Sequence, residues 1–179
     1  MSDRTPIGLL ELSLKTIIVH TLTYTFMGVL AYTFMHYDEA FAKPELSCWM
    51  RPTSDPLVMA GPLFQPIRGL IFALAFFPIR DFLFNKKNGW LITWWILAAL
   101  GILSTFGPAP GSVEGMVYTI LPISIDTYLE VVPQAFLLSG LLFYWIKNYN
   151  KRWLNWIMGI AFIIIIIMPI LGLIFRNIS

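Results

Sequence analysis

A single arginine inside a long apolar run constrains this chain more than any other feature. The run extends over residues 57–79 and carries Gln65, Pro66 and Arg68 among leucine, isoleucine and phenylalanine. Arg68 lies about ten residues into the run, which is roughly 15 Å along a helix. A charge at that depth of a bilayer is costly unless other parts of the protein accommodate it. The sequence therefore predicts a helix whose Arg68 face is turned toward protein or water.

The composition is that of an integral membrane protein. Of the 179 residues, 58% are hydrophobic and only 12% are charged, and the mean hydropathy is +0.73. Soluble domains carry about 25% charged residues, so the shortage of charge decides the class. At about 20 residues for each crossing, the chain can form roughly four to six spans. It leaves no room for a separate soluble domain, so residues 1–179 are predicted to form a single membrane domain.

Charge and cysteine content exclude several classes of function. The formal net charge is +2 and lysine and arginine form no long run, so a nucleic-acid partner is not indicated. Cys48 is the single cysteine, which excludes an internal disulfide and a CxxC metal or redox motif. The bilayer is the one partner that the composition requires. Other membrane subunits, or further copies of this chain, stay open as partners.

Hydropathy predicts an all-α polytopic membrane protein with about five transmembrane helices. The predicted spans are 16–36, 57–79, 90–106, 128–147 and 153–175. Residues 116–126 are apolar but too short to cross as a helix, so we expect a re-entrant or interfacial segment before the fourth span. The glycines and prolines of residues 107–115 predict a tight turn ahead of it. The last span is almost entirely aliphatic and is expected to face lipid.

Basic residues predict the orientation of these spans. With a cytoplasmic N-terminus and five crossings, eight lysines and arginines fall inside and three fall outside. This asymmetry follows the positive-inside rule and places the C-terminus outside. The simplest location is a bacterial cytoplasmic membrane.

Polar side chains on three of the predicted spans define a candidate cavity. Along the first span, polar and small residues recur every four positions and form one face. The candidate cavity residues are Arg68, Gln65, His20, Tyr24, Tyr32, Glu130 and Gln134. Arg68 would hold an anionic group in this interpretation. The structural alternative is an ion pair of Arg68 with Glu130 or Glu114, or hydrogen bonds from Arg68 to backbone carbonyls that Pro62 and Pro66 free.

A second group of polar residues lies at the predicted outer mouth. Its candidates are His36, Arg51, Asp55 and Glu114. Paired carboxylates on loops can bind a cation or act as acid and base in hydrolysis. However, the sequence contains no HExxH motif, no GxSxG motif and no specific metal-ligand spacing, so neither a metal site nor an enzyme is favoured.

A haem cofactor is not indicated either. His20 and His36 are sixteen residues apart, about 24 Å along one helix, so they cannot ligate the same iron within one chain. A bis-histidine haem would need a histidine from another subunit. No other cofactor is suggested by the residues present.

Three functions fit these features. The leading expectation is a transport-type or ligand-binding membrane protein with a polar intramembrane cavity around Arg68. The second is an accessory subunit of a larger membrane complex, which the small size and the small-residue faces permit. The third is a membrane enzyme that acts at the outer interface through Asp55 or Glu114.

Overall fold

The computed structural model describes residues 7–48, 50–105, 107, 109–120 and 125–176. Within these ranges all regular secondary structure is helical, which confirms the all-α prediction. The principal helices are α1 (Leu9–Phe34), α5 (Gly61–Phe76), α7 (Gly89–Ala98), α9 (Ile125–Lys147) and α10 (Arg152–Arg176). The short helical segments are α2 (Tyr37–Ala42), α3 (Pro44–Ser47), α4 (Pro56–Met59), the 3-10 turn η1 (Phe77–Ile79), α6 (Arg80–Asn85), the π-helix η2 (Ala99–Leu103) and α8 (Val113–Tyr118).

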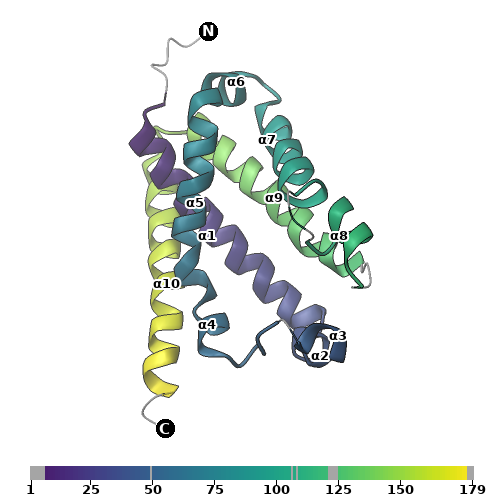
Figure 1. Cartoon of the computed structure of the whole chain (residues 1–179). Helices are drawn as coiled ribbons and strands as arrows, with labels where there is room; N and C mark the ends of the chain where they lie inside the picture. The colour runs from purple at the N-terminus through teal and green to yellow at the C-terminus, as the bar shows by residue number, and fades with distance from the viewer. Residues whose placement is uncertain (1–6, 49, 106, 108, 121–124, 177–179) are drawn as a thin grey trace.

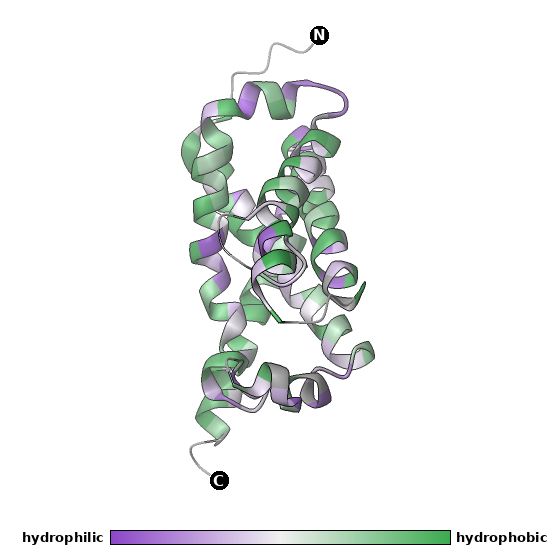
Figure 2. Ribbon diagram, turned by 45° about the vertical axis from the view of Figure 1, so that its right-hand side comes forward, coloured by the Kyte–Doolittle hydropathy of each residue, from purple (hydrophilic) through white to green (hydrophobic). Residues whose placement is uncertain are grey.

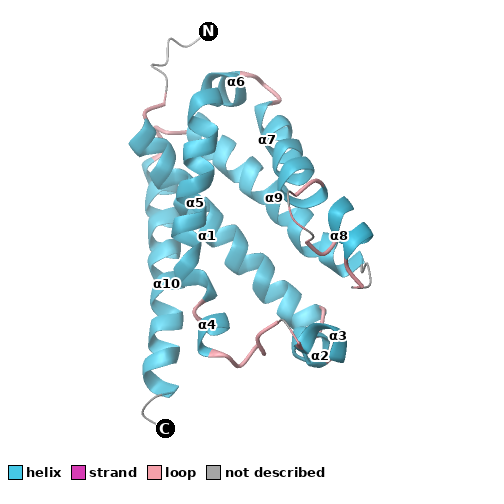
Figure 3. Cartoon of the chain, in the orientation of Figure 1, coloured by secondary structure: helices cyan, strands magenta, loops and turns pink. Residues whose placement is uncertain are grey.

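The helices are arranged around α1, which runs diagonally through the molecule (Figure 1). Helices α5 and α10 lie on one side of it, and α9 crosses toward α7 and α8 on the other. The start of α1 and the end of α10 lie at opposite ends of the molecule. The start of α1, α6 and the connection from α9 to α10 share one end, whereas α2, α3 and α4 lie at the other. Longer loops accompany α4 and α8 (Figure 3).

Three helices are long and apolar enough to cross a membrane. They are Leu9–Phe34, Tyr128–Lys147 and Arg152–Phe175, and they correspond to the first, fourth and fifth predicted spans. In the most apolar window of the last one, only 6% of residues are buried within the molecule, in accord with the expected lipid-facing helix. The protein is therefore an all-helical chain with at least three candidate membrane-spanning helices.

The second and third predicted spans differ from the helices that form. The helix over 57–79 is interrupted at Ala60, so that α4 ends at Met59 and α5 begins at Gly61. Proline lacks a backbone N–H, and Pro62 and Pro78 stand where α5 and η1 begin. Helix α7 ends at Ala98 and continues as a π-helix to Leu103, which gives a shorter segment than the predicted 90–106.

Helix α1 begins seven residues before its predicted span, because its first turns pack against the molecule. Lys15 is buried, its Nζ donates to Glu11 Oε1 at 2.7 Å, and it lies 5.6 Å from the centroid of the Trp145 ring on α9. Leu12 and Val19 on the same helix are completely buried in the hydrophobic core. The segment before residue 16 is thus a continuation of the first helix.

The turn before α8 is built as its glycines predict. Gly111 has a φ of 81°, which a side chain would strain. The buried Ser112 hydroxyl accepts from Gly115 N at 3.0 Å and donates to Ala109 O at 2.8 Å. Residues 121–124 lie outside the described part of the chain. The re-entrant or interfacial interpretation of 116–126 therefore remains a prediction, with α8 as its described beginning.

The backbones of helices α1 and α5 approach each other closely at Gly69. A Cβ added to Gly69 would lie 2.7 Å from Ile17 Cα and 3.3 Å from Thr16 O. Ala73, one turn later on α5, is completely buried. Small residues at four-residue spacing let membrane helices approach closely, as the sequence Gly69–Ala73 suggests.

This contact predicts that Gly69→Ala destabilises the protein by about 1–3 kcal/mol, because a methyl group has no room between the backbones. Gly28→Ala on α1 is the matched control, since a Cβ there meets nothing within 4 Å. Thermal unfolding in detergent is the measurement. Equal melting temperatures for the two variants would show that the α1–α5 contact is not close.

Candidate functional site

A pocket of about 180 Å³ lies between α1, α5, α7, η2 and α9. Its polar lining residues are His20, Arg68, Thr105 and Gln134. The apolar lining residues are Phe72, Leu97, Gly101, Ile102, Ala109, Pro110, Val131, Ala135 and Leu138. Arg68, His20 and Gln134, which the sequence placed in a common cavity, thus come together from three helices.

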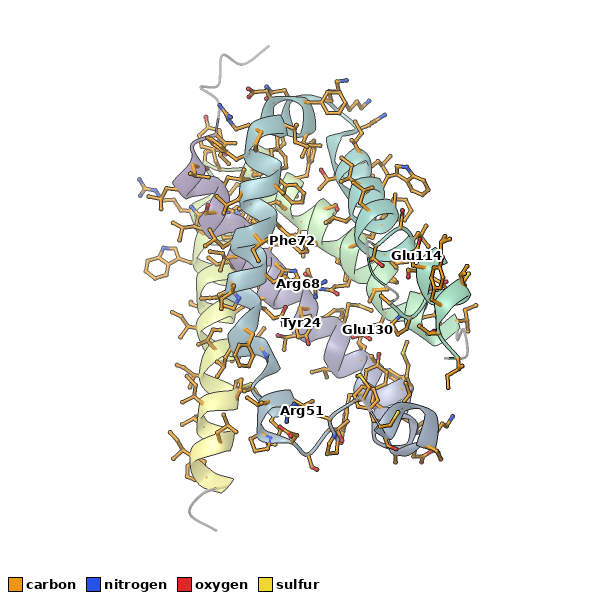
Figure 4. All side chains as sticks on the ribbon, in the orientation of Figure 1. Tyr24, Arg51, Arg68, Phe72, Glu114 and Glu130 are labelled. Atoms are coloured by element: carbon orange, nitrogen blue, oxygen red, sulfur yellow. The ribbon has the colours of Figure 1, made fainter. Side chains whose placement is uncertain are left out.

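The Arg68 guanidinium is the charged group of this pocket. Figure 4 shows Arg68 beside the space between α5 and α9, with Phe72 above it and Tyr24 below. Its Cζ lies 5.6 Å from the centroid of the Phe72 ring, within the range of a cation–π contact. No described residue forms an ion pair with Arg68. The structural alternative, a pair with Glu130 or Glu114, is therefore not formed in the described structure.

His20 is held at the edge of the pocket by Gln65. The two side chains are both buried, and His20 Nε2 lies 3.1 Å from Gln65 Oε1. Gln65 Nε2 donates to Gly61 O at 3.1 Å, which orients its carbonyl oxygen toward the histidine. With this orientation of the Gln65 amide, Nε2 of His20 is the donor in the contact. Nδ1 is buried without a hydrogen-bond partner among the described residues.

Tyr24 and Glu130 lie beyond the pocket, toward the end that carries α2. Tyr24 is half-buried and within Coulombic range of both Glu130 and Arg68. Tyr37 OH donates to Glu130 Oε2 and so joins α2 to α9. Figure 4 shows Arg68, Tyr24 and Glu130 following one another along the space between α5 and α9. These two predicted cavity residues therefore extend its polar surface without lining the pocket.

The remaining candidates are not gathered into one site. Tyr32 is 54% exposed and does not line the pocket, and His36 is exposed just beyond the end of α1. Arg51 Nη1 donates to Asp55 Oδ2 at 3.1 Å, and Asp55 Oδ1 also caps α4 by accepting from Leu57 N. Glu114 is exposed on α8, away from Arg51 (Figure 4).

The four predicted outer-mouth residues therefore form no common cluster. Nor do the described residues include a group of three or more histidine, cysteine, aspartate or glutamate side chains able to hold a metal ion.

The sequence did not predict the apolar wall of the pocket or the contribution of the α7–η2 segment to that wall. Leu97, Gly101 and Ile102 come from the α7–η2 segment, which carries no polar stripe. The π-helix there leaves no distinct signature in the sequence, although π-helical turns are frequent at functional sites. Gly101 within an otherwise apolar run is the one signal that could have pointed to this segment.

The chain matches no protein-family model, no curated protein and no solved structure. The pocket and its charge are therefore the basis for any statement about function.

The His20–Gln65 contact generates a prediction about stability. We expect Gln65→Leu to lower the free energy of unfolding by about 1–3 kcal/mol, because Nε2 of the buried His20 loses its acceptor. Gln134→Leu is the control, since Gln134 lines the same pocket without a side-chain hydrogen bond to a described residue. Thermal unfolding in detergent compares the two. Equal losses of stability in the two variants would mean that the His20–Gln65 hydrogen bond makes no specific contribution to the free energy of unfolding.

Proposed function

We propose that this chain is a multi-pass membrane protein that binds a small anionic ligand at Arg68, as a transporter or ligand-binding protein. The observation that carries the proposal is a guanidinium without an ionic partner in the described structure, beside a pocket and midway along an apolar helix. Charged residues within membrane helices mark ligand and ion pathways more often than they serve packing alone.

The pocket's charge favours an anion over a cation. Arg68 brings one positive charge, and no carboxylate is among the lining residues. His20 brings no negative charge to the pocket in either of its protonation states, so it does not repel an anion. A guanidinium presents five donors in a planar fork, which matches the oxygens of a carboxylate or a phosphate. Gln134 adds an amide donor on the opposite wall.

The proposal includes five crossings with a cytoplasmic N-terminus. In this topology α5 and the α7–η2 segment each cross the membrane as a short span. Helix α8 and the residues around it lie on the outer side. The support comes from basic residues at one end of the molecule. The start of α1, α6 and the α9–α10 connection share that end, and these connections carry Arg80, Lys86, Lys87, Lys147 and Lys151. A cytoplasmic location of this end satisfies the positive-inside rule.

A second candidate function is that of a subunit in a larger membrane complex. The observation in its favour is α10, whose exposed side carries an apolar groove. The groove is lined by Asn155, Trp156, Gly159, Ile160 and Ile163. A partner helix would fill such a groove, and lipid chains would fill it equally well. An enzymatic role is not proposed, because Asp55 caps a helix and Glu114 stands on a different element.

The proposed function predicts that Arg68→Gln weakens binding of an anionic ligand by about tenfold or more, through loss of a charged hydrogen-bond donor. Native mass spectrometry of protein gently extracted from its own membrane measures the bound ligand. Arg51→Gln is the control, because Arg51 is exposed and lies away from the pocket. An anionic adduct retained by a folded Arg68→Gln variant contradicts the proposal. Co-purifying subunits without a small ligand would instead favour the second candidate.

The proposed orientation predicts one-sided labelling of the single cysteine. Cys48 is exposed next to α3. A membrane-impermeant maleimide should therefore label it in right-side-out vesicles and not in inside-out vesicles. The control is Cys48→Ser combined with Lys87→Cys, since Lys87 lies in the opposite turn and should show the reverse pattern. Labelling of Cys48 from the cytoplasmic side alone would overturn the orientation.

A further inference from the structure

The Arg68 pocket lies between two helices that do not pack on each other. Helix α5 packs along α1, and α7 packs along α9, whereas no extensive contact between described residues joins α5 to α7. The two helices leave the α6 turn and diverge (Figure 1). Arg68 and Phe72 line the pocket from α5, and Gly101 and Ile102 line it from η2. The pocket thus occupies the place where these consecutive helices separate.

The surfaces on both sides of this separation are apolar. On α5, Ile67 and Ile71 flank Arg68 and are 63% and 59% exposed. On η2, Leu100 is 66% exposed. Figure 2 shows hydrophilic residues midway along α5 with hydrophobic residues above and below them. In a bilayer, exposed aliphatic side chains face lipid, so the pocket is bordered by lipid-facing surface.

The mostly apolar lining of the pocket favours a ligand that is itself mostly apolar. Apart from Arg68, His20, Thr105 and Gln134, the lining is aliphatic, aromatic or small. A fully hydrated anion would leave this wall without a partner. A ligand with an acyl or isoprenoid chain next to its anionic group would bury the wall and gain the free energy of removing apolar area from water.

We propose that the ligand is an anionic amphiphile of the bilayer, which enters laterally between α5 and α7. Its phosphate or carboxylate binds Arg68, and the first carbons of its chain lie against Phe72, Ile102 and Leu138. The rest of the chain stays in the bilayer, because a pocket of about 180 Å³ is smaller than the roughly 300–1,000 Å³ that enclose a drug-sized ligand. This inference rests on the proposed anion site and adds the source and the shape of its ligand.

Three probes separate the head group from the chain: inorganic phosphate, octyl phosphate and octyl glucoside. Their binding to the full chain in an uncharged detergent is measured by native mass spectrometry. We expect octyl phosphate to bind at least about tenfold more tightly than inorganic phosphate, since burial of two methylene groups already gives that factor. Octyl glucoside, which has the chain without the charge, should bind weakly.

Arg68→Gln should weaken octyl phosphate binding by about tenfold or more and leave octyl glucoside binding unchanged. Arg68→Lys keeps the positive charge and loses the planar fork, so its affinity for octyl phosphate should be intermediate. It also serves as a second test if the glutamine variant is unstable. Melting temperatures establish that each variant is folded.

Gly101→Leu tests the lateral entry. A Cβ at Gly101 meets nothing within 4 Å, so a larger side chain can begin there, and a leucine would narrow the separation between η2 and α5. We expect a larger loss of affinity for octyl phosphate than for inorganic phosphate. Gly172→Leu on α10 is the matched control, since a Cβ at Gly172 also meets nothing within 4 Å and α10 contributes no residue to the lining of the pocket.

The outcomes distinguish this inference from the proposed function. If phosphate and octyl phosphate bind with equal affinities that both depend on Arg68, the anion site is supported and the proposal that its ligand is an amphiphile is contradicted. Unchanged octyl phosphate binding in Gly101→Leu would overturn lateral entry. Binding of both phosphates that is independent of residue 68 would overturn the anion site itself, and the inference with it.

Discussion

The cost of placing a guanidinium in an apolar medium governs this structure. Arg68 belongs to an apolar helix, and no described side chain neutralises it. A Phe72 ring contact compensates a small part of the desolvation that an arginine undergoes in a bilayer. In the proposed function, an anion bound in the pocket beside Arg68 supplies the rest of the compensation.

Two adjacent faces of α5 have different surroundings: one packs on α1, and the other lines the pocket. Gln65, Gly69 and Ala73 recur every four residues and face α1, where the backbones approach closely and His20 is held. Arg68 and Phe72, one position earlier than Gly69 and Ala73, form the neighbouring face and line the pocket. The close contact with α1 therefore fixes the rotation of α5. Because that rotation is fixed, Arg68 lies at the pocket that it shares with α9, where its side chain stays exposed.

Hydropathy predicted the three longest apolar helices, because it follows from local sequence. Residue spacing assigned Arg68, His20 and Gln134 to the polar faces of three helices, and tertiary packing brings them to one pocket. Hydropathy and spacing did not predict the break at Ala60 or the π-helix at Ala99–Leu103, which depend on how proline and tertiary packing end a helix. Tyr32 was assigned to the cavity because its spacing places it on the same helical face as His20, but it is exposed and does not line the pocket. The outer-mouth residues were grouped by loop position. Arg51 and Asp55 pair beside α4, whereas His36 follows α1 and Glu114 lies on α8.

Solid-state NMR in bilayers tests the central claim most directly. Dipolar coupling is measured from the ¹⁵N-labelled Arg68 guanidinium to the ³¹P of octyl phosphate, and to ¹³C-labelled glutamate carboxylates. We expect coupling to phosphorus at hydrogen-bonding range and none to the Glu130 carboxylate. Coupling to the Glu130 carboxylate with no coupling to phosphorus would contradict the proposed anion site, because Arg68 would then be a structural ion pair.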